Sequence, residues 1–189
     1  MTVTAANYEQ LPANLPVPED DGAAAHLAGA AMPSIVLPAT TGETLDLSQL
    51  GPRAIVYVYP MTGTPGVPLI DGWNEIPGAR GCTPESMGFR DSFEELAAMG
   101  AQVFGLSVQS SAEQGEAAAR LGLPFPLLSD FWPHGAVAKL YGVFDEDKGV
   151  ATRGTFIIDK AGLVRWEVVN PIPQARDIAE YQKVLAELS

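Results

Sequence analysis

Apolar runs and helically spaced apolar residues alternate along the chain. The runs at 54–59 (AIVYVY) and 102–108 (QVFGLSV) have strand length and almost no polar positions, which is typical of strands buried on both faces of a sheet. Helical spacing follows each run, and the final segment carries it on Ile178, Tyr181, Leu185 and Leu188. Strands alternating with helices predict an α/β architecture.

Turn residues add two hairpins and several shorter elements to this pattern. Segments 35–37 and 44–47 flank ATTG, and segments 155–158 and 163–168 flank DKAG, so each pair predicts a hairpin. Ser111 and Gln114 fit a capping box for a helix ending near residue 121, and Ser129-Asp130 fits the cap of a short helix. We expect a three-layer sandwich, in which helices flank a central mixed sheet.

The chain divides into two parts by composition. Residues 1–31 are rich in Pro, Ala and Asp and show no sustained period, which predicts an extended N-terminal arm. Residues 32–189 carry all the predicted strands and helices and are long enough to bury one core. We therefore predict an arm followed by one domain.

An unusual loop lies inside the predicted domain. The segment 60–81 contains five glycines and four prolines, so it predicts no regular element. Loops this long inside a compact domain are usually functional or disordered. Trp73 within it has two interpretations, since its side chain either anchors the loop or covers a site, and we favour the anchor.

Composition narrows the possible partners. The net charge of −12 and the pI of about 4.4 argue against nucleic acid and anionic membranes as partners. No apolar run approaches the ~20 residues of a membrane span, and the first residues lack the basic and apolar regions of a secretory signal. These features predict a soluble cytoplasmic protein.

Cys82 is the single cysteine of the chain, a count that excludes an internal disulfide, a CxxC pair and a thiolate zinc site. With two histidines, the chain offers no convincing metal set, and we expect neither metal nor cofactor.

Cys82 precedes a predicted helix start. Thr83 fits the N-cap, Pro84 the first helical position, and Glu85 places negative charge in the first turn. The positive end of a helix dipole favours a thiolate, and together with a cation it lowers a cysteine pKa from about 8.5 to roughly 3.5–7.5. Two interpretations stay open: a reactive thiol, or a small buried apolar residue.

Arg153 stands at the start of a buried strand, where a long cation requires a partner. Its partner is either a carboxylate, Glu85 or Asp130, or the thiolate itself, and the two roles are compatible. A thiolate that cleaves a peroxide needs such a fixed cation, because negative charge develops on the leaving oxygen.

Four separated motifs, in order, resemble the peroxiredoxins, which are thiol peroxidases on the thioredoxin fold. They are YVYP at 57–60, CTPESMGFRD at 82–91, FPLLSD at 125–130 and RGTFIIDKAG at 153–162. The resemblance covers about 32–189. The segment from 126 to 159 is most similar to the one-cysteine alkyl hydroperoxide reductase E type, whereas the long loop is similar to another bacterial branch.

The resemblance implies a role for five residues. Cys82 matches the peroxidatic cysteine, which becomes a sulfenic acid. Arg153 matches the arginine that holds the thiolate and polarises the peroxide, and Glu85 the acid that orients this arginine. Pro60 matches the proline that shields the site, and Thr64 matches the threonine whose hydroxyl bonds thiolate and peroxide.

The chain departs from the family pattern before the cysteine. The threonine usually stands three residues before it, but here that position is Ala79, and 17 residues separate Thr64 from Cys82. If the loop bulges outward, Thr64 still reaches the site; otherwise Thr62 or a backbone N–H must substitute.

A second departure is Met87, which stands where the related branch carries a second, resolving cysteine. The resemblance therefore implies a peroxide substrate and an external thiol reductant, such as thioredoxin, glutaredoxin or a mycoredoxin with mycothiol. The arm, the aromatic pair Phe131-Trp132 and the family's habit of pairing predict at least a homodimer. The alternative function is a non-enzymatic redox sensor or binding module on the same fold.

Overall fold

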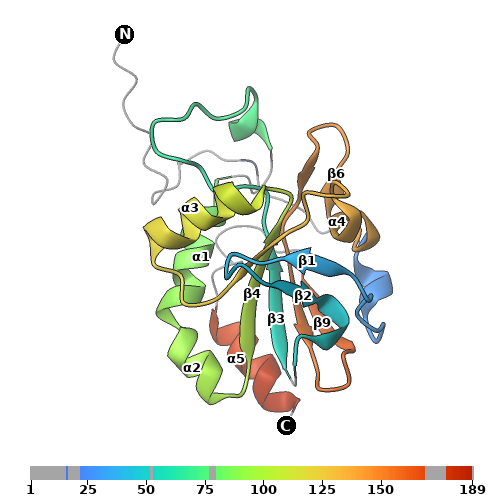
Figure 1. Ribbon diagram of the computed structural model, residues 1–189. Coiled ribbons are helices and arrows are strands. Elements are labelled where there is room, and N and C mark those ends of the chain that lie inside the picture. The colour runs from blue at the N-terminus through green and yellow to red at the C-terminus, as the bar shows by residue number, and fades with distance from the viewer. Residues whose placement is uncertain (1–15, 17–21, 52, 77–79, 169–177, 189) are drawn as a thin grey trace.

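A five-stranded sheet forms the centre of the molecule (Figure 1). The computed structural model describes residue 16 and residues 22–51, 53–76, 80–168 and 178–188. The strand order is β5-β4-β3-β8-β9, with bounds Leu127–Ser129, Gln102–Ser107, Ala54–Val58, Gly154–Ile158 and Val164–Val168. Strands β3, β4 and β5 are parallel, whereas β8 is antiparallel to both β3 and β9. The predicted mixed sheet and the C-terminal hairpin are confirmed.

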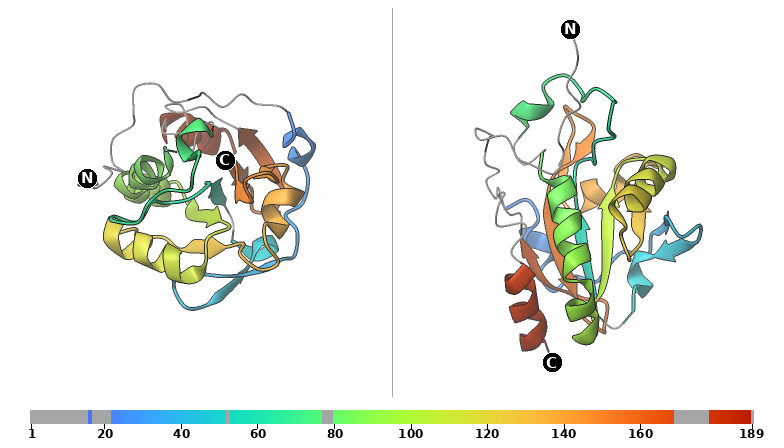
Figure 2. Two further views of the ribbon diagram at one scale, coloured as in Figure 1. Left: turned by 90° about the horizontal axis from the view of Figure 1, so that it is seen from above. Right: turned by 90° about the vertical axis from the view of Figure 1, so that its left-hand side faces the viewer.

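Helices cover the sheet on both faces, as the three-layer prediction requires. One face packs against α1 (Cys82–Asp91), α2 (Phe93–Ala98) and α5 (Ile178–Glu187). The other face packs against α4 (Ala136–Leu140) and the predicted N-terminal hairpin of β1 (Val36–Pro38) and β2 (Thr44–Asp46). Helix α3 (Ser111–Leu121) packs beside β5. Figure 2 shows α5 and the hairpin on opposite sides of the sheet.

Shorter elements complete the described chain. They are the 3₁₀ turns η1 (Ala25–Leu27), η2 (Leu47–Gln49) and η3 (Trp73–Glu75), and the two-residue strands β6 (Phe144–Asp145) and β7 (Val150–Ala151). In its described residues, the loop after β3 contains η3 as its one regular element, and it projects above the sheet in Figure 1. No helix among the described residues combines the length and the apolar character needed to cross a bilayer.

Alternation along each buried strand builds two cores. Ile55 and Tyr57 of β3 face α1 and α5, whereas Ala54, Val56 and Val58 face the hairpin and α4. All five residues are fully buried, as expected for a strand covered on both sides. The apolar run therefore supplies side chains to both layers.

An aromatic stack fixes α1 against the sheet. The Tyr57 ring stacks on Phe89 of α1 at 4.6 Å between centroids, and Phe89 stacks on Tyr181 of α5 at 5.5 Å. The Tyr57 hydroxyl donates to Ser86 Oγ, 3.1 Å away. Gly105 of β4 makes room for this ring, since a Cβ there would lie 2.8 Å from it. The start of α1 is thus held in a fixed position over the end of β3.

Two capping predictions have different outcomes. The N-cap residue of the short helix α4 is Gly135, not Ser129 or Asp130, but the Asp130 carboxylate accepts hydrogen bonds from the N–H groups of Val137 and Ala138, so the capping prediction is confirmed for Asp130 only. The capping box of α3 was predicted one residue too late, because it consists of Ser110 and Glu113. Gln114 is fully buried instead, and its amide donates to Ser107 Oγ and the Leu128 carbonyl.

The described part of the predicted arm packs on the domain. Gly29 N–H donates to the Val164 carbonyl, Val164 N–H donates to the Ala30 carbonyl, and Leu27 is buried. Residues 1–15 and 17–21 lie outside the described residues, so the boundary between 31 and 32 stays a prediction.

Candidate active site

Helix α1 begins at Cys82 itself, not after it. Gly81 occupies the N-cap position without a side-chain hydrogen bond, and Glu85 N–H donates to the Gly81 carbonyl at 3.0 Å. The predicted N-cap at Thr83 is therefore wrong by two residues, and Pro84 lies at the third helical position. The correction places the sulfur in the first turn, where backbone N–H groups lack helical partners.

Cys82, Glu85 and Arg153 meet in the interior, with only 1–2% of each exposed. Arg153 Nη2 donates to Cys82 Sγ at 3.4 Å, and Nη1 forms an ion pair with Glu85 Oε2. Glu85 lies one turn after Cys82 on α1, so a single guanidinium contacts both side chains. Of the two acids considered as partners for Arg153, the structure pairs it with Glu85, whereas Asp130 caps α4.

Strand register brings Arg153 to the cysteine. Val58, the last residue of β3, pairs with Gly154, the first residue of β8. Arg153 directly precedes Gly154, so it lies at the carboxyl end of β3, the same edge at which α1 begins. Ligand sites of α/β sheets lie at this edge.

Burial dominates the ionisation of Cys82. Burial raises the pKa of the Cys82 thiol, while the charge of Arg153 and a hydrogen bond from the Met61 N–H lower it. The direction differs from the lowered pKa expected from the helix start, because the sulfur is almost completely removed from water. Burial lowers the pKa of Arg153, because it disfavours the charged guanidinium. The neighbouring Glu85 and Cys82 have a larger effect in the other direction, so the pKa of Arg153 is raised. The guanidinium therefore stays charged.

The loop after β3 supplies a second donor. Met61 directly follows the buried Pro60, and its backbone N–H donates to the sulfur of Cys82. Thr62 is buried, but its hydroxyl donates to Gln109 Oε1 at 3.1 Å. Of the two substitutes considered for the family's threonine, the structure brings the backbone N–H to the sulfur.

Thr64 and Pro60 are not among the residues that line the cavity at the Cys82 sulfur. Thr64 is half-buried, and its carbonyl accepts from Val67 N–H at 3.1 Å. The residues lining the cavity at the sulfur include Met61 and Gly63 but not Thr64. The roles of Thr64 and Pro60 stay predictions.

A small cavity adjoins the sulfur. Its volume is about 10 Å³, roughly the space for one water-sized molecule, and its lining is Met61, Gly63, Leu69, Trp73, Arg80, Cys82 and Thr83. Trp73 is only 3% exposed and belongs to the core on the hairpin side of the sheet. Both interpretations of Trp73 therefore hold, because its side chain anchors the loop and also walls the cavity.

Sequence reasoning missed two residues at this site. Met61 contributes a main-chain group, which its side-chain type does not reveal, and Gln109 approaches through the pairing of β3 with β4. Among the described residues, no group of three or more His, Cys, Asp or Glu side chains is arranged to hold a metal ion.

A cysteine in the first turn of a helix, held by a buried arginine on a thioredoxin-like sheet, defines a thiol-dependent oxidoreductase. The model of the AhpC/TSA family matches residues 76–167. Alkyl hydroperoxide reductase E of Mycobacterium tuberculosis is 38% identical over 108 residues, covering 57% of this chain and 71% of that protein. The chloroplastic peroxiredoxin Q of Oryza sativa subsp. japonica is 33% identical over 162 residues, covering 85% and 67%.

Solved structures agree with this assignment. The peroxidoxin BcpB of Mycobacterium tuberculosis superposes with a TM-score of 0.66 at 29% identity, covering 85% of this chain and 95% of that one. AhpC of Enterococcus faecalis, with a TM-score of 0.68 at 21% identity and coverage of 85% and 91%, supports the fold alone. The chain belongs to the peroxiredoxin family, and it is a peroxidase with one cysteine, a peroxide substrate and a thiol reductant.

Proposed function

We propose that Cys82 is the peroxidatic cysteine of a one-cysteine peroxidase. The sulfur attacks one peroxide oxygen, the O–O bond breaks, and the second oxygen leaves with the thiol proton as water or an alcohol. The sulfur gains one oxygen and becomes a sulfenic acid. The observation that carries this proposal is the convergence of Cys82, Arg153 and Glu85, because Arg153 donates to the sulfur while Glu85 holds its other nitrogen.

Arg153 stabilises the charge that moves during this step. The thiolate carries negative charge at first, and the leaving oxygen carries it as the O–O bond breaks. A fixed cation with two donor nitrogens stabilises the negative charge on the thiolate and on the leaving oxygen, because the cation needs no reorganisation during the reaction. Pro60 and Thr64 keep their proposed parts, Pro60 in shielding the sulfur and Thr64 in bonding the peroxide.

The cavity favours the smallest substrate. Its volume of about 10 Å³ suits hydrogen peroxide better than a bulky organic hydroperoxide. Leu69 and Trp73 close it on the side of the loop. We therefore propose hydrogen peroxide as the preferred peroxide.

An external thiol must reduce the sulfenic acid. The chain holds no second cysteine, and Met87 stands where the related branch carries one. A low-molecular-weight thiol or a redoxin, such as thioredoxin, glutaredoxin or a mycoredoxin with mycothiol, attacks the sulfenic sulfur, which releases water and leaves a mixed disulfide with Cys82. A second thiol then attacks the reductant's sulfur in this mixed disulfide, so that the reductant leaves as a disulfide and Cys82 returns to the thiol. This requirement supports a reducing compartment such as the cytoplasm.

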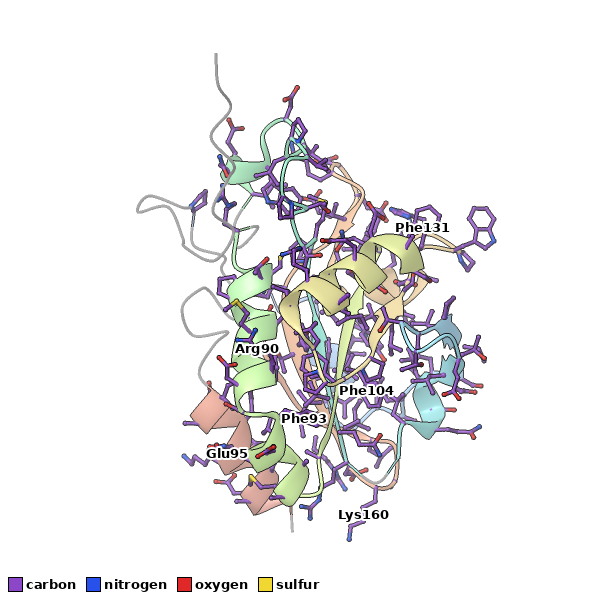
Figure 3. The ribbon with its side chains drawn as sticks, turned by 60° about the vertical axis from the view of Figure 1, so that its left-hand side comes forward. Arg90, Phe93, Glu95, Phe104, Phe131 and Lys160 are labelled. Atoms are coloured by element: carbon purple, nitrogen blue, oxygen red, sulfur yellow. The ribbon has the colours of Figure 1, made fainter. Side chains whose placement is uncertain are left out.

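Two exposed aromatic side chains support a homodimer. Trp132 is 82% exposed and Phe131 is 50% exposed, so neither packs in the core of this chain. Phe131 lies at the molecular surface in Figure 3. Exposed aromatic groups beside each other are typical of protein interfaces. We propose that this segment contacts a second copy of the chain.

Turnover tests the proposed function. With excess dithiothreitol as reductant, the wild-type chain should consume many peroxide molecules, whereas Cys82→Ser should consume none and remain folded. A redox sensor would be oxidised once and stop. Stoichiometric consumption in excess reductant would therefore contradict the peroxidase and favour the sensor.

A further inference from the structure

Met61 gives the sulfur of Cys82 a main-chain hydrogen-bond donor. Met61 lines the small cavity at Cys82, and its N–H donates to the sulfur as a second donor beside Arg153. A donor stabilises developing charge only if it is held in place before the charge appears. Met61 lies in a glycine- and proline-rich loop rather than in a strand or helix, so something outside the loop must hold it.

Gln109 holds the next residue, Thr62, through three hydrogen bonds. Thr62 N–H and its hydroxyl both donate to Gln109 Oε1, at 2.9 and 3.1 Å. Gln109 Nε2 donates back to the Thr62 carbonyl at 3.3 Å. The exposed fractions are 3% for Thr62 and 7% for Gln109. One amide side chain thus bonds both main-chain groups of Thr62, as a neighbouring strand would.

Gln109 is itself fixed at the ends of two strands. It follows β4, its N–H donates to Ser107 Oγ at 3.3 Å, and its carbonyl accepts from Ser129 Oγ at 2.6 Å. On the loop side, Arg120 of α3 donates to the Gly63 carbonyl at 2.9 Å. Rigid elements therefore hold Thr62 and Gly63 from outside the loop.

We propose that Gln109 is a positioning residue for the peroxidase reaction, because its side chain holds Thr62 so that the Met61 N–H stays on the sulfur of Cys82. The inference rests on the proposed function. Only an amide of this length supplies an acceptor and a donor to the same residue. Without the amide of Gln109, two buried donors of Thr62 lose their acceptor. The free energy of the segment around Thr62 then falls when it turns toward water, which supplies new acceptors. That movement takes the Met61 N–H away from the sulfur.

The test replaces the amide and measures the thiol. Gln109→Met keeps the length of the side chain and removes its hydrogen bonds. Loss of a donor destabilises the thiolate, so the pKa of Cys82 should rise by roughly one pH unit in a titration of thiolate absorbance. The second-order rate constant with hydrogen peroxide should fall about 10²-fold, the cost of a misplaced catalytic group.

Two further variants serve as a control and as a partial removal of the hydrogen bonds. Gln182→Met makes the same chemical change at a glutamine that bonds Glu95 at 2.8 Å on the surface, and it should change neither quantity. Thr62→Val removes one of the three hydrogen bonds and should shift the pKa in the same direction by less. A larger effect from Thr62→Val would overturn the proposal, because the hydroxyl would then act on its own.

A purely structural role for Gln109 has a different signature. Gln109→Met would then lower the unfolding midpoint and leave the thiol pKa and the rate constant at wild-type values, which would refute the proposal. If Gln109→Met does not fold, Gln109→Asn, whose amide is too short to reach Thr62, decides by the same two measurements. The thiol titration needs no turnover, so it separates failure of this inference from failure of the proposed peroxidase.

Discussion

Replacing Arg153 with lysine separates its two contacts. The guanidinium contacts Glu85 through Nη1 and the Cys82 sulfur through Nη2, which is 3.4 Å away. A lysine has one nitrogen, and the buried carboxylate of Glu85 retains it. The ion pair survives, so Arg153→Lys avoids the ~3–5 kcal/mol cost of breaking a buried pair and should fold. The donor to the sulfur is lost, because lysine cannot reproduce the planar fork.

The expected magnitude follows from this single lost donor. Removal of one preorganised donor costs about 2.7–4 kcal/mol of transition-state stabilisation, or on the order of 10²–10³ in rate. Single-turnover mixing with hydrogen peroxide, followed by intrinsic fluorescence, measures the rate constant directly. The pKa of Cys82 should also rise, since the hydrogen bond from Arg153 to the sulfur lowers it and the lysine does not supply that bond.

Arg165→Lys provides the matched control for this variant. Arg165 is half exposed and pairs with Asp159 at 2.5 Å, and exposed pairs contribute only about 0–1 kcal/mol. The control should retain the wild-type rate. An Arg153→Lys variant within about threefold of wild type would refute the reasoning, because Arg153 would then be only a structural partner of Glu85.

Three further changes test neighbouring parts of the site. Glu85→Gln should lower the pKa of Cys82 in a thiolate titration, because the negative charge of Glu85 raises it, and a higher pKa would contradict this sign. Leu69→Ala should increase the rate with cumene hydroperoxide relative to hydrogen peroxide, since Leu69 walls the small cavity, and an unchanged ratio would show that the cavity does not select the substrate. Met87→Cys should form a peroxide-dependent disulfide between positions 82 and 87 and yield less sulfinic acid than wild type, as measured by mass spectrometry of the peptides. Both positions lie within α1, so the first turns must unwind, and absence of the disulfide would show that the helix is too rigid.

Much of the fold could be predicted from local patterns in the sequence. The buried strands and both hairpins follow from apolar runs and turn residues, which depend on near neighbours in the chain. The first residues of the helices were predicted less accurately, because neighbouring residues can each serve as the N-cap. Ser110 and Ser111 are both candidates for α3, and Gly81 and Thr83 are both candidates for α1. In α3, Gln114 is buried and Ser110 is the N-cap, whereas in α1 the helix already includes Cys82 and Gly81 is the N-cap.

The site depended on contacts that the linear sequence does not contain. Family resemblance indicated Arg153 and Glu85, but the pairing of Val58 with Gly154 explains why the arginine reaches the sulfur. The raised pKa of Cys82 follows from burial, which a helix start alone does not reveal. The Met61 N–H was foreseen only as an unspecified backbone donor, since the path of the long loop is not encoded in a repeating pattern.

Trapping the oxidised cysteine tests the central claim most directly. The protein is treated with one equivalent of hydrogen peroxide in the presence of dimedone, and the peptide containing Cys82 is analysed by mass spectrometry. The account predicts a dimedone adduct on Cys82, formed from the sulfenic acid, and no adduct in Cys82→Ser. An unmodified Cys82 thiol, with the peroxide still present, would contradict the assignment of Cys82 as the peroxidatic cysteine.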